Sequence, residues 1–312
     1  MPTKPHEAIL DRELSKAEAK EVIETASQLL QELVNYATNA LIRCSTSKSL
    51  SGKEDEDRAI LALYRHIIEL TDGIEVMLSQ GCALAAIPVL RSSFEASLAI
   101  EYILEKNEDY VQRSLAWIIG YLHNTIDKYE CYDPSTKKGQ EAKELFDKDI
   151  EMDLLQRPIA PIAVIQENIT KIQAQLAKPH LELIEKEYQR QIALQKPKKR
   201  IEWYSLFDGP RSLLRLTKHL RRGASYVILY KQWSTIAHAE SNSFLTRTNE
   251  GDYFIRRLRD IGQIREVANF SAVYLLRTTR LILKELRPGE EQALATWYKR
   301  DVQKPFQAIL KG

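Results

Sequence analysis

The sequence predicts an all-α protein, an elongated helical bundle with an inserted helical hairpin. Apolar residues recur at steps of three and four along most of the 312 residues, the spacing that places them on one face of an α-helix. No Asn-Gly or Asp-Gly turn joins two alternating apolar runs, so the signals for strands are poor. Hydrophobic residues make up 44% of the chain and charged residues 28%, which are ordinary values for a globular protein.

The glycines and cysteines exclude several classes of site. No two of the 11 glycines lie closer than eight residues. A GxGxxG dinucleotide loop, a GxxxxGK[ST] phosphate loop and a GxSxG nucleophile elbow all need closer pairs. The 3 cysteines are widely spaced without a CxxC pair, which excludes a disulfide framework and a Cys-rich zinc site and is typical of a reducing compartment. We therefore expect a cytoplasmic protein with no metal or cofactor.

The N-terminal part of the chain predicts four helices in succession. Ser15-Lys-Ala-Glu18 has the pattern of a capping box, and apolar residues from Val22 to Leu41 predict a helix of about eight turns behind it. A polar stretch predicts a loop over 45–57. The helices expected next cover 58–79, 83–105 and 108–130. The third of these is strongly apolar, but no uninterrupted apolar run approaches the roughly 18–20 residues that span a bilayer, so we expect no membrane contact.

The remaining helices are predicted in the same way. An acidic segment over 133–153 predicts a peripheral helix, and helices over 162–176 and 180–194 form an inserted hairpin that ends in a basic linker, Lys196–Arg200. A short helix after Pro210 and longer helices over 225–240 and 252–286 follow, the last one stopped by Arg287-Pro288-Gly289. The predicted organisation is an N-terminal helix and loop (1–54), a bundle core (55–290, with peripheral helices in 133–200) and a C-terminal helix and tail (291–312).

The charge of the chain is unevenly distributed. Residues 1–195 hold 22 Lys and Arg against 32 Asp and Glu, whereas residues 196–312 hold 23 against 11. Such a split is found where one half binds RNA or an acidic protein, and also where the two halves pack or dimerise against each other. Trp203, Tyr204 and Tyr253 lie among the basic residues and are suited to stack on unpaired bases. The candidate nucleic-acid-binding residues are Lys198, Lys199, Arg200, Arg221, Arg222, Arg256 and Arg257.

A first candidate site lies on the predicted helix 83–105. Arg91 and Glu95 are four residues apart, on one face of a helix that is otherwise almost wholly apolar. Unpaired charges are costly in such surroundings, so both side chains must find partners. Arg before Glu is the less favourable order for an ion pair within one helix, which indicates partners on another helix. A structural ion pair inside a bundle has the same pattern.

A second candidate site lies on the predicted helix 225–240. Tyr226, Tyr230, Ser234 and His238 follow one another at steps of four and would form one stripe. Histidine exchanges a proton near neutral pH, so His238 is a candidate for proton transfer. A hydrogen-bonded histidine of the core is the alternative. No second histidine or carboxylate has metal-ligand spacing in this stripe, which disfavours a metal site.

The stretches LRSSFEASLAIEYIL and YKQWSTIAHAE resemble domain-of-unknown-function family 5677, a set of bacterial and archaeal all-α proteins. The family pattern is an R-x-x-x-E helix followed later by a helix with Tyr, Ser and His at four-residue steps. The matching positions are Arg91, Glu95, Tyr230, Ser234 and His238, and the resemblance covers roughly residues 55–285. It implies an all-α fold and directs attention to these five residues, but it implies no particular reaction.

A looser likeness is to the helical HEPN nucleases, which cleave RNA without metal through an Arg-x4–6-His motif. The chain departs from that motif, because no Arg is separated from a following His by four to six residues. Arg91 would have to take that role from another helix.

Three functions follow as hypotheses. The first is a homodimeric binding or effector module of a stress or phage-defence system, with the five residues forming a polar cluster between helices. The second is a metal-independent, HEPN-like ribonuclease in which His238 transfers a proton and Arg91 stabilises charge on phosphate. The third is a purely structural hydrogen-bond network that specifies how helices pair.

Overall fold

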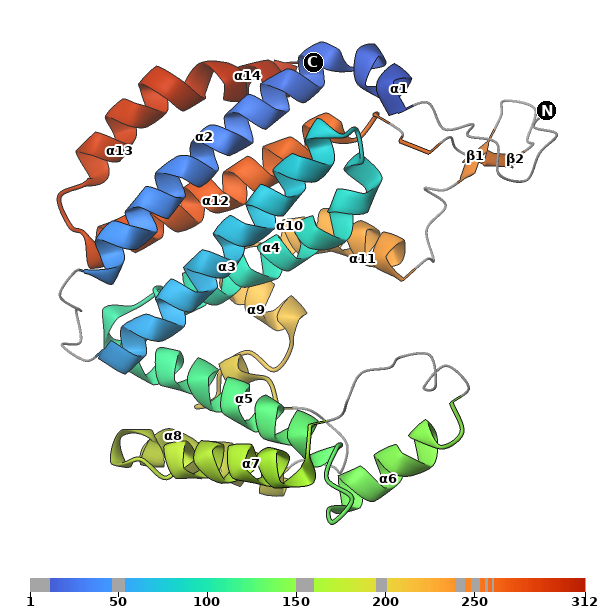
Figure 1. Cartoon of the computed structure of the whole chain (residues 1–312). Coiled ribbons are helices and arrows are strands. Elements are labelled where there is room, and N and C mark those ends of the chain that lie inside the picture. Colours follow the sequence, from blue (N-terminus) through green and yellow to red (C-terminus); the bar gives the residue numbers. More distant parts are fainter. Residues whose placement is uncertain are drawn as a thin grey trace. The chain divides into compact units, whose positions relative to one another are not determined.

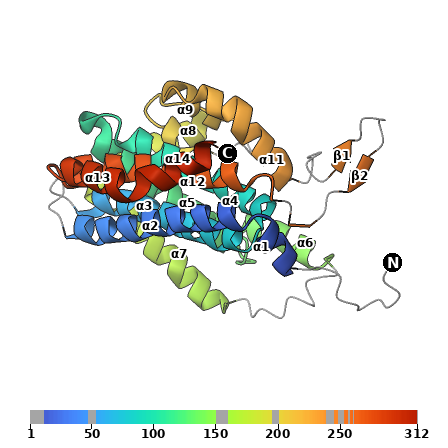
Figure 2. The same ribbon diagram turned by 90° about the horizontal axis from the view of Figure 1, so that it is seen from above.

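A computed structural model describes residues 12–46, 54–149, 160–194, 201–238, 245–247, 253–255, 258–259 and 261–311. Helices dominate the described residues, and their only sheet is a short two-stranded hairpin (Figures 1 and 2). The prediction of an all-α bundle is therefore confirmed. The chain forms two compact units, the first from residues 1–110 and 214–312, and the second from residues 111–213. The boundaries expected after residues 54 and 290 stay a prediction.

Four long helices form the core of the first unit: α2 (Lys20–Ser45), α3 (Glu54–Ser79), α4 (Ala83–Ile103) and α12 (Ile264–Leu286). Helix α3 packs against both α2 and α4, and α12 packs against all three (Figure 1). Shorter elements complete the unit: α1 (Arg12–Glu18), η1 (Asn107–Asp109), α9 (Leu213–His219), α10 (Gly223–Ser225), the π-helical turn η5 (Tyr226–Tyr230), α11 (Lys231–Ala237), α13 (Glu291–Trp297), the π-helical turn η7 (Tyr298–Val302) and α14 (Gln303–Lys311).

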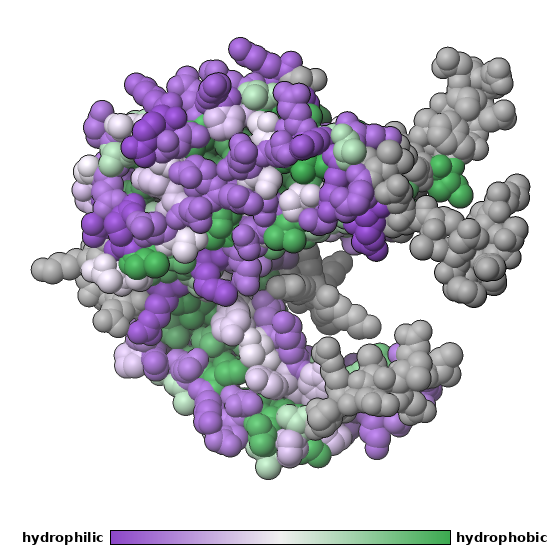
Figure 3. Space-filling model, turned by 45° about the horizontal axis from the view of Figure 1, so that its top comes forward, coloured by the Kyte–Doolittle hydropathy of each residue, from purple (hydrophilic) through white to green (hydrophobic). Residues whose placement is uncertain are grey.

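The buried faces of these helices follow the apolar spacing of the sequence. The stripe predicted in the first long helix is confirmed, with Leu29, Leu30 and Leu33 among its buried residues. The capping box is wrong, because Ser15 lies inside α1 and α2 begins after Ala19, which makes no side-chain cap. Among the described residues, α4 alone is long and apolar enough to cross a membrane, and 61% of its most apolar window is buried inside the protein. Figure 3 shows a face on which hydrophilic side chains cover most of the described surface.

The second unit consists of α5 (Tyr110–Glu130), α6 (Lys137–Phe146), α7 (Ile162–Leu176), η3 (Pro179–Leu181), α8 (Glu182–Leu194) and η4 (Trp203–Ser205). Its core joins one face of α5 to apolar residues of α7, α8 and the segment after residue 200. Trp203 packs against Gly120 of α5. Helices are confirmed in the three predicted segments 133–153, 162–176 and 180–194, and the range of α7 is the predicted one. Their expected peripheral, inserted placement stays a prediction.

Two predicted helices of the C-terminal part are wrong in detail. The helix expected over 252–286 begins only at Ile264, and Tyr253–Ile255 forms strand β2, which pairs antiparallel with β1 (Leu245–Arg247). The helix expected over 225–240 is not a continuous α-helix, because the turn Tyr226–Tyr230 is π-helical and α11 ends at Ala237. Strand pairing and an i to i+5 turn both depend on contacts that a local spacing of apolar residues does not encode.

Gly139 gives a test of packing in the second unit. A Cβ at this position would overlap the backbone carbonyl of Asp133, whereas a Cβ at Gly73 of α3 would meet no atom within 4 Å. We expect Gly139→Ala to lower the free energy of unfolding by about 1–3 kcal/mol through overpacking. Gly73→Ala should raise it by about 0.5–1 kcal/mol, because alanine is the better helix former. Urea denaturation of both variants measures this, and equal effects of the two would contradict the packing at Gly139.

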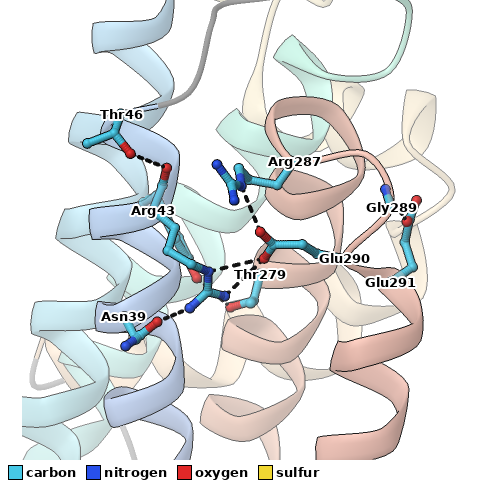
Figure 4. A network of polar contacts seen from close by, with 9 residues as sticks. Asn39, Arg43, Thr46, Thr279, Arg287, Gly289, Glu290 and Glu291 are labelled. Carbon is cyan, nitrogen blue, oxygen red and sulfur yellow. Dashed lines mark hydrogen bonds and ion pairs between the residues drawn. The ribbon is translucent and has the colours of Figure 1, made fainter.

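A polar network joins the C-terminal end of α2 to the connection between α12 and α13 (Figure 4). Arg43 Nε donates to Glu290 Oε2 over 3.1 Å, and Arg287 Nε donates to Glu290 Oε1 over 2.7 Å. Arg43 also donates to Asn39 on its own helix. Partial burial opposes ionisation of Glu290, but the hydrogen bonds from Arg287 and Arg43 outweigh it and hold the pKa of this carboxyl below its ordinary value.

This network predicts a pH-dependent contribution to stability. Because the pKa of Glu290 is lower in the folded protein, its contribution is complete above the ordinary value of 4.5 and is lost as the pH falls through the folded value. We expect Glu290→Gln to lower the free energy of unfolding by about 1–2 kcal/mol at pH 7. The difference from the unmodified protein should shrink as the pH falls below 4.5, because a protonated Glu290, like Gln, carries no charge. Urea midpoints at pH 7 and at a series of pH values below 4.5 measure this, and a pH-independent difference would refute it.

Candidate functional site

Helix α4 supplies the first two residues of the candidate site. Arg91 and Glu95 lie one turn apart, with side chains 23% and 43% exposed on a helix that is otherwise mostly buried. Arg91 Nε lies 3.3 Å from Glu95 Oε1, an ion-pair distance, but it makes no hydrogen bond to any residue that the structure describes. The guanidinium is therefore oriented mainly by another element, as the Arg-before-Glu order predicted.

That element is the π-helical turn η5. Arg91 Nη2 donates to the Tyr230 hydroxyl over 2.7 Å, and this hydroxyl donates to Glu95 Oε1 over 2.9 Å. The guanidinium carbon lies 4.7 Å from the centre of the Tyr230 ring. This ring stacks on that of Tyr226, with 4.9 Å between ring centres, and lies tilted against that of Phe94, with 5.9 Å between ring centres. Burial and the negative charge of Glu95 raise the pKa of Tyr230 to about 12. The Tyr230 hydroxyl thus stays protonated at neutral pH and can accept from Arg91 while it donates to Glu95.

His238 completes the group at the C-terminal end of α11. Its side chain is exposed, and its backbone N–H donates to the carbonyl of Ser234 over 3.0 Å. Arg91 Nη1 lies 3.5 Å from His238 Nε2. This contact is a hydrogen bond only while Nε2 carries no proton, because a protonated ring and a guanidinium both only donate. We call Arg91, Glu95, Tyr230 and His238 the Arg91 cluster.

The structure brings four of the five predicted residues together. Ser234 is half-buried, and no hydrogen bond of its side chain occurs within the described part of the chain. Its contribution is the backbone carbonyl that accepts from His238. The stripe at four-residue steps is altered because η5 is π-helical, yet the π-turn still stacks Tyr226 on Tyr230.

Sequence reasoning missed a second charged group in the same unit. Glu101 of α4 accepts from Arg222 Nε and Nη2 over 3.3 and 2.8 Å, and its Oε2 lies 3.6 Å from Arg277 Nη2. Arg277 Nη2 also donates to Ser97 over 3.0 Å. Two arginines thus share one carboxylate that is only 16% exposed. The signal in the sequence was a third charge, Glu101, in an apolar helix.

Only two of the predicted nucleic-acid-binding residues, Arg221 and Arg222, lie within the described residues. Arg222 is half-buried and bound to Glu101, whereas Arg221 is exposed. Residues Lys198, Lys199, Arg200, Arg256 and Arg257 lie outside the described residues. Of the aromatic residues expected beside them, Trp203 is half-buried and packs against the core of the second unit. No three His, Cys, Asp or Glu side chains of the described chain could hold a metal ion together.

One comparison with known proteins finds a match. The model of the Family of unknown function (DUF5677) matches residues 57–254, a segment that includes all four residues of the Arg91 cluster. No curated protein and no solved structure matches the chain. Because the matched segment is more than half of the 312 residues, the chain belongs to the Family of unknown function DUF5677.

Proposed function

We propose that the protein is an RNA-binding effector module whose Arg91 cluster receives a phosphate of the RNA. The observation that carries this proposal is the contact of Arg91 Nη1 with Nε2 of the exposed His238 at 3.5 Å. Two groups that can each donate to a phosphate oxygen face each other there, one of them at the surface. A stress or phage-defence setting and a homodimeric state stay predictions.

The other members of the cluster support this use of Arg91. Arg91 Nη2 donates to the Tyr230 hydroxyl, and Arg91 Nε lies beside Glu95, so these two contacts fix the orientation of the guanidinium. Nη1 is the nitrogen directed toward the exposed His238. A phosphate oxygen would accept from Nη1, and a protonated His238 would donate to the same phosphate. Glu95 and Tyr230 would then act as positioning residues, since neither has to touch the RNA.

The surrounding charge favours an anionic partner. Residues 214–238, which carry Tyr230 and His238, contain five Lys or Arg and no Asp or Glu. Lys218, Arg221 and Lys231 of this segment are exposed. Basic side chains supply most of the affinity of proteins for nucleic acid through contacts with phosphates. The segment thus offers several such contacts on the same stretch of chain as Tyr230 and His238.

Fluorescence anisotropy with a labelled single-stranded RNA tests the binding. Each phosphate contact should add about 0.7 to the steepness with which log affinity falls against log salt. We expect Arg91→Gln to weaken binding about tenfold and to reduce this slope by about 0.7. Arg65→Gln is the matched control. Arg65 also pairs with a glutamate one turn further on, Glu69, at 3.2 Å, but this pair lies on α3 and the Arg65 side chain is 68% exposed. A flat salt response, or equal affinities of both variants, would reject the proposal.

Cleavage of the bound RNA is a second candidate function, favoured by the same approach of Arg91 to His238. In a ribonuclease without metal, a histidine transfers the proton and a fixed cation stabilises the charge that develops on phosphate. His238 is exposed and Arg91 is held by Tyr230, which suits these two roles. The arginine comes from α4 and not from α11, the helix that His238 follows, as the missing Arg-x4–6-His motif required.

Incubation of the purified protein with total RNA, with and without a chelator, tests cleavage. We expect chelator-resistant cleavage that falls by about 10²–10⁴-fold in His238→Ala, the usual contribution of a general acid or base. His66→Ala is a matched control, because His66 is also exposed but lies on α3. RNA binding without any cleavage would be consistent with the binding module and would reject the ribonuclease function.

A further inference from the structure

A second candidate binding site lies in the first unit, apart from the Arg91 cluster. A cavity of about 790 Å³ is formed between α12 and the segment made by α13 and η7. Ligand sites commonly have volumes of about 300–1,000 Å³, so the size is that of a small-molecule site. Four cationic side chains line it: Arg277, Arg280, Lys284 and Lys299.

The cavity has a single acidic lining residue, and that residue is already engaged. Glu291 Oε2 accepts from the backbone N–H of Gly289 over 3.0 Å (Figure 4). Backbone hydrogen bonds from Glu291 and Gly289, and then the charges of Lys284 and Arg280, lower the pKa of Glu291. Lys284 also lies 3.4 Å from Glu285. The lining therefore keeps an excess of positive charge around Arg280 and Lys299, both of which are exposed.

Arg277 adds a fixed positive charge to the lining. Its Nη2 is held by Ser97 over 3.0 Å and lies 3.6 Å from Glu101, the carboxylate that Arg222 also occupies. Its Nε is buried and has no hydrogen-bond partner in the described part of the chain. One carboxylate thus balances two guanidinium groups, and a positive charge remains uncompensated beside the cavity. Such an arrangement attracts an anion.

Part of the lining is apolar. Leu294 and Ala295 of α13 and the ring of Tyr298 contribute to it, and Tyr298 begins the π-helical turn η7. π-Helical turns inside helices occur frequently at functional sites. A ligand that fills this cavity needs an anionic part for the cations and a flat apolar part for Leu294 and Tyr298.

We propose that this cavity binds a nucleoside diphosphate, with the diphosphate on Arg280, Lys299 and Arg277 and the base against Tyr298 and Leu294. Arginine and lysine side chains bind phosphate oxygens through charge-assisted hydrogen bonds. An aromatic ring and an aliphatic side chain offer the base a stacking surface. The site is separate from the proposed RNA-binding function and does not depend on it.

Isothermal titration of the full chain with ADP, pyrophosphate and adenosine tests the proposal. We expect ADP to bind at least tenfold more tightly than adenosine or pyrophosphate, because it alone uses both parts of the lining. Arg280→Ala should weaken ADP binding at least tenfold, and Tyr298→Ala should weaken ADP binding but leave pyrophosphate binding unchanged. Both are compared with Lys304→Ala, which removes an exposed lysine of α14 outside the lining.

Arg91→Gln separates this site from the Arg91 cluster, because it should leave ADP affinity unchanged. Failure of a folded protein to bind ADP would overturn the proposal, as would an unchanged ADP affinity in Arg280→Ala. Pyrophosphate binding as tight as ADP binding would overturn the assignment of a nucleoside. Loss of ADP binding in Arg91→Gln would place the nucleotide at the Arg91 cluster and would also overturn it.

Discussion

Replacement of Glu101 by Gln is expected to lower the free energy of unfolding by about 2–3 kcal/mol, because it removes the charge of a partly buried carboxylate that two arginines share. Glu101 is 16% exposed and is the carboxylate shared by Arg222 and Arg277. Glutamine has nearly the same size, so the change removes charge and leaves packing intact. Two guanidinium groups would then face each other without a counter-charge. Urea denaturation at low salt, which leaves the ion pair unscreened, measures the loss.

Glu69→Gln is the control for this prediction. Glu69 also pairs with an arginine, Arg65, but its side chain is 59% exposed, and exposed pairs contribute about 0–1 kcal/mol. A double-mutant cycle of Glu101→Gln with Arg222→Gln should show a coupling between the two sites, because both changes act on one ion pair. A Glu101→Gln variant as stable as Glu69→Gln would contradict the role of Glu101.

Trp233→Ala is the second substitution with a large expected effect, about 3–5 kcal/mol of lost stability. Trp233 is 1% exposed and contacts three aromatic rings edge-on: Phe270 at 5.6 Å, Phe94 at 6.4 Å and Tyr274 at 6.5 Å. Its Nε1 donates to Glu266 Oε1 over 3.4 Å. These contacts fasten α11 to α4 and α12. Thermal denaturation followed by circular dichroism measures the loss.

The anchoring of α11 has a functional consequence. Because His238 directly follows α11, we expect Trp233→Ala to lose RNA affinity even at temperatures where the bundle remains folded. Trp233→Phe, which keeps an aromatic ring in the core, should retain most of both properties. Tyr121→Ala serves as the control, because Tyr121 is 57% exposed and surface changes of this kind alter stability by about 0.5 kcal/mol or less. Undiminished RNA affinity in a folded Trp233→Ala variant would contradict the anchoring role.

The helices could be predicted from the sequence wherever apolar spacing and a clear boundary coincide. Helix α7 has the predicted range, since Pro161 precedes it and its apolar residues keep helical spacing. The hairpin of β1 and β2 and the π-helical turn at Tyr226 were not predictable in this way. A strand depends on its partner, and tyrosines four residues apart lie on nearly the same side of an α-helix and of a π-helix.

The candidate site was predictable in its members but only partly in its geometry. Two charges in an apolar helix require partners, and this reasoning correctly placed the partner of Arg91 on another element. The sequence does not specify which residue that is, because Tyr230 lies 139 residues away from Arg91. Glu101 follows the same rule and was missed, since its partners Arg222 and Arg277 are equally remote in the sequence. Because its partner Glu101 was not recognised, Arg222 was predicted to bind nucleic acid instead.

A double-mutant cycle on RNA affinity tests most directly whether Arg91 and His238 bind one phosphate. The four proteins are the unmodified chain, Arg91→Gln, His238→Gln and the double variant, each measured by anisotropy at one salt concentration. If both side chains act on the same phosphate, each single change should weaken binding about tenfold, and the double variant should be scarcely weaker than either. Additive losses, about a hundredfold in the double variant, would contradict a shared phosphate, and single variants that bind as tightly as the unmodified chain would contradict RNA binding at the Arg91 cluster.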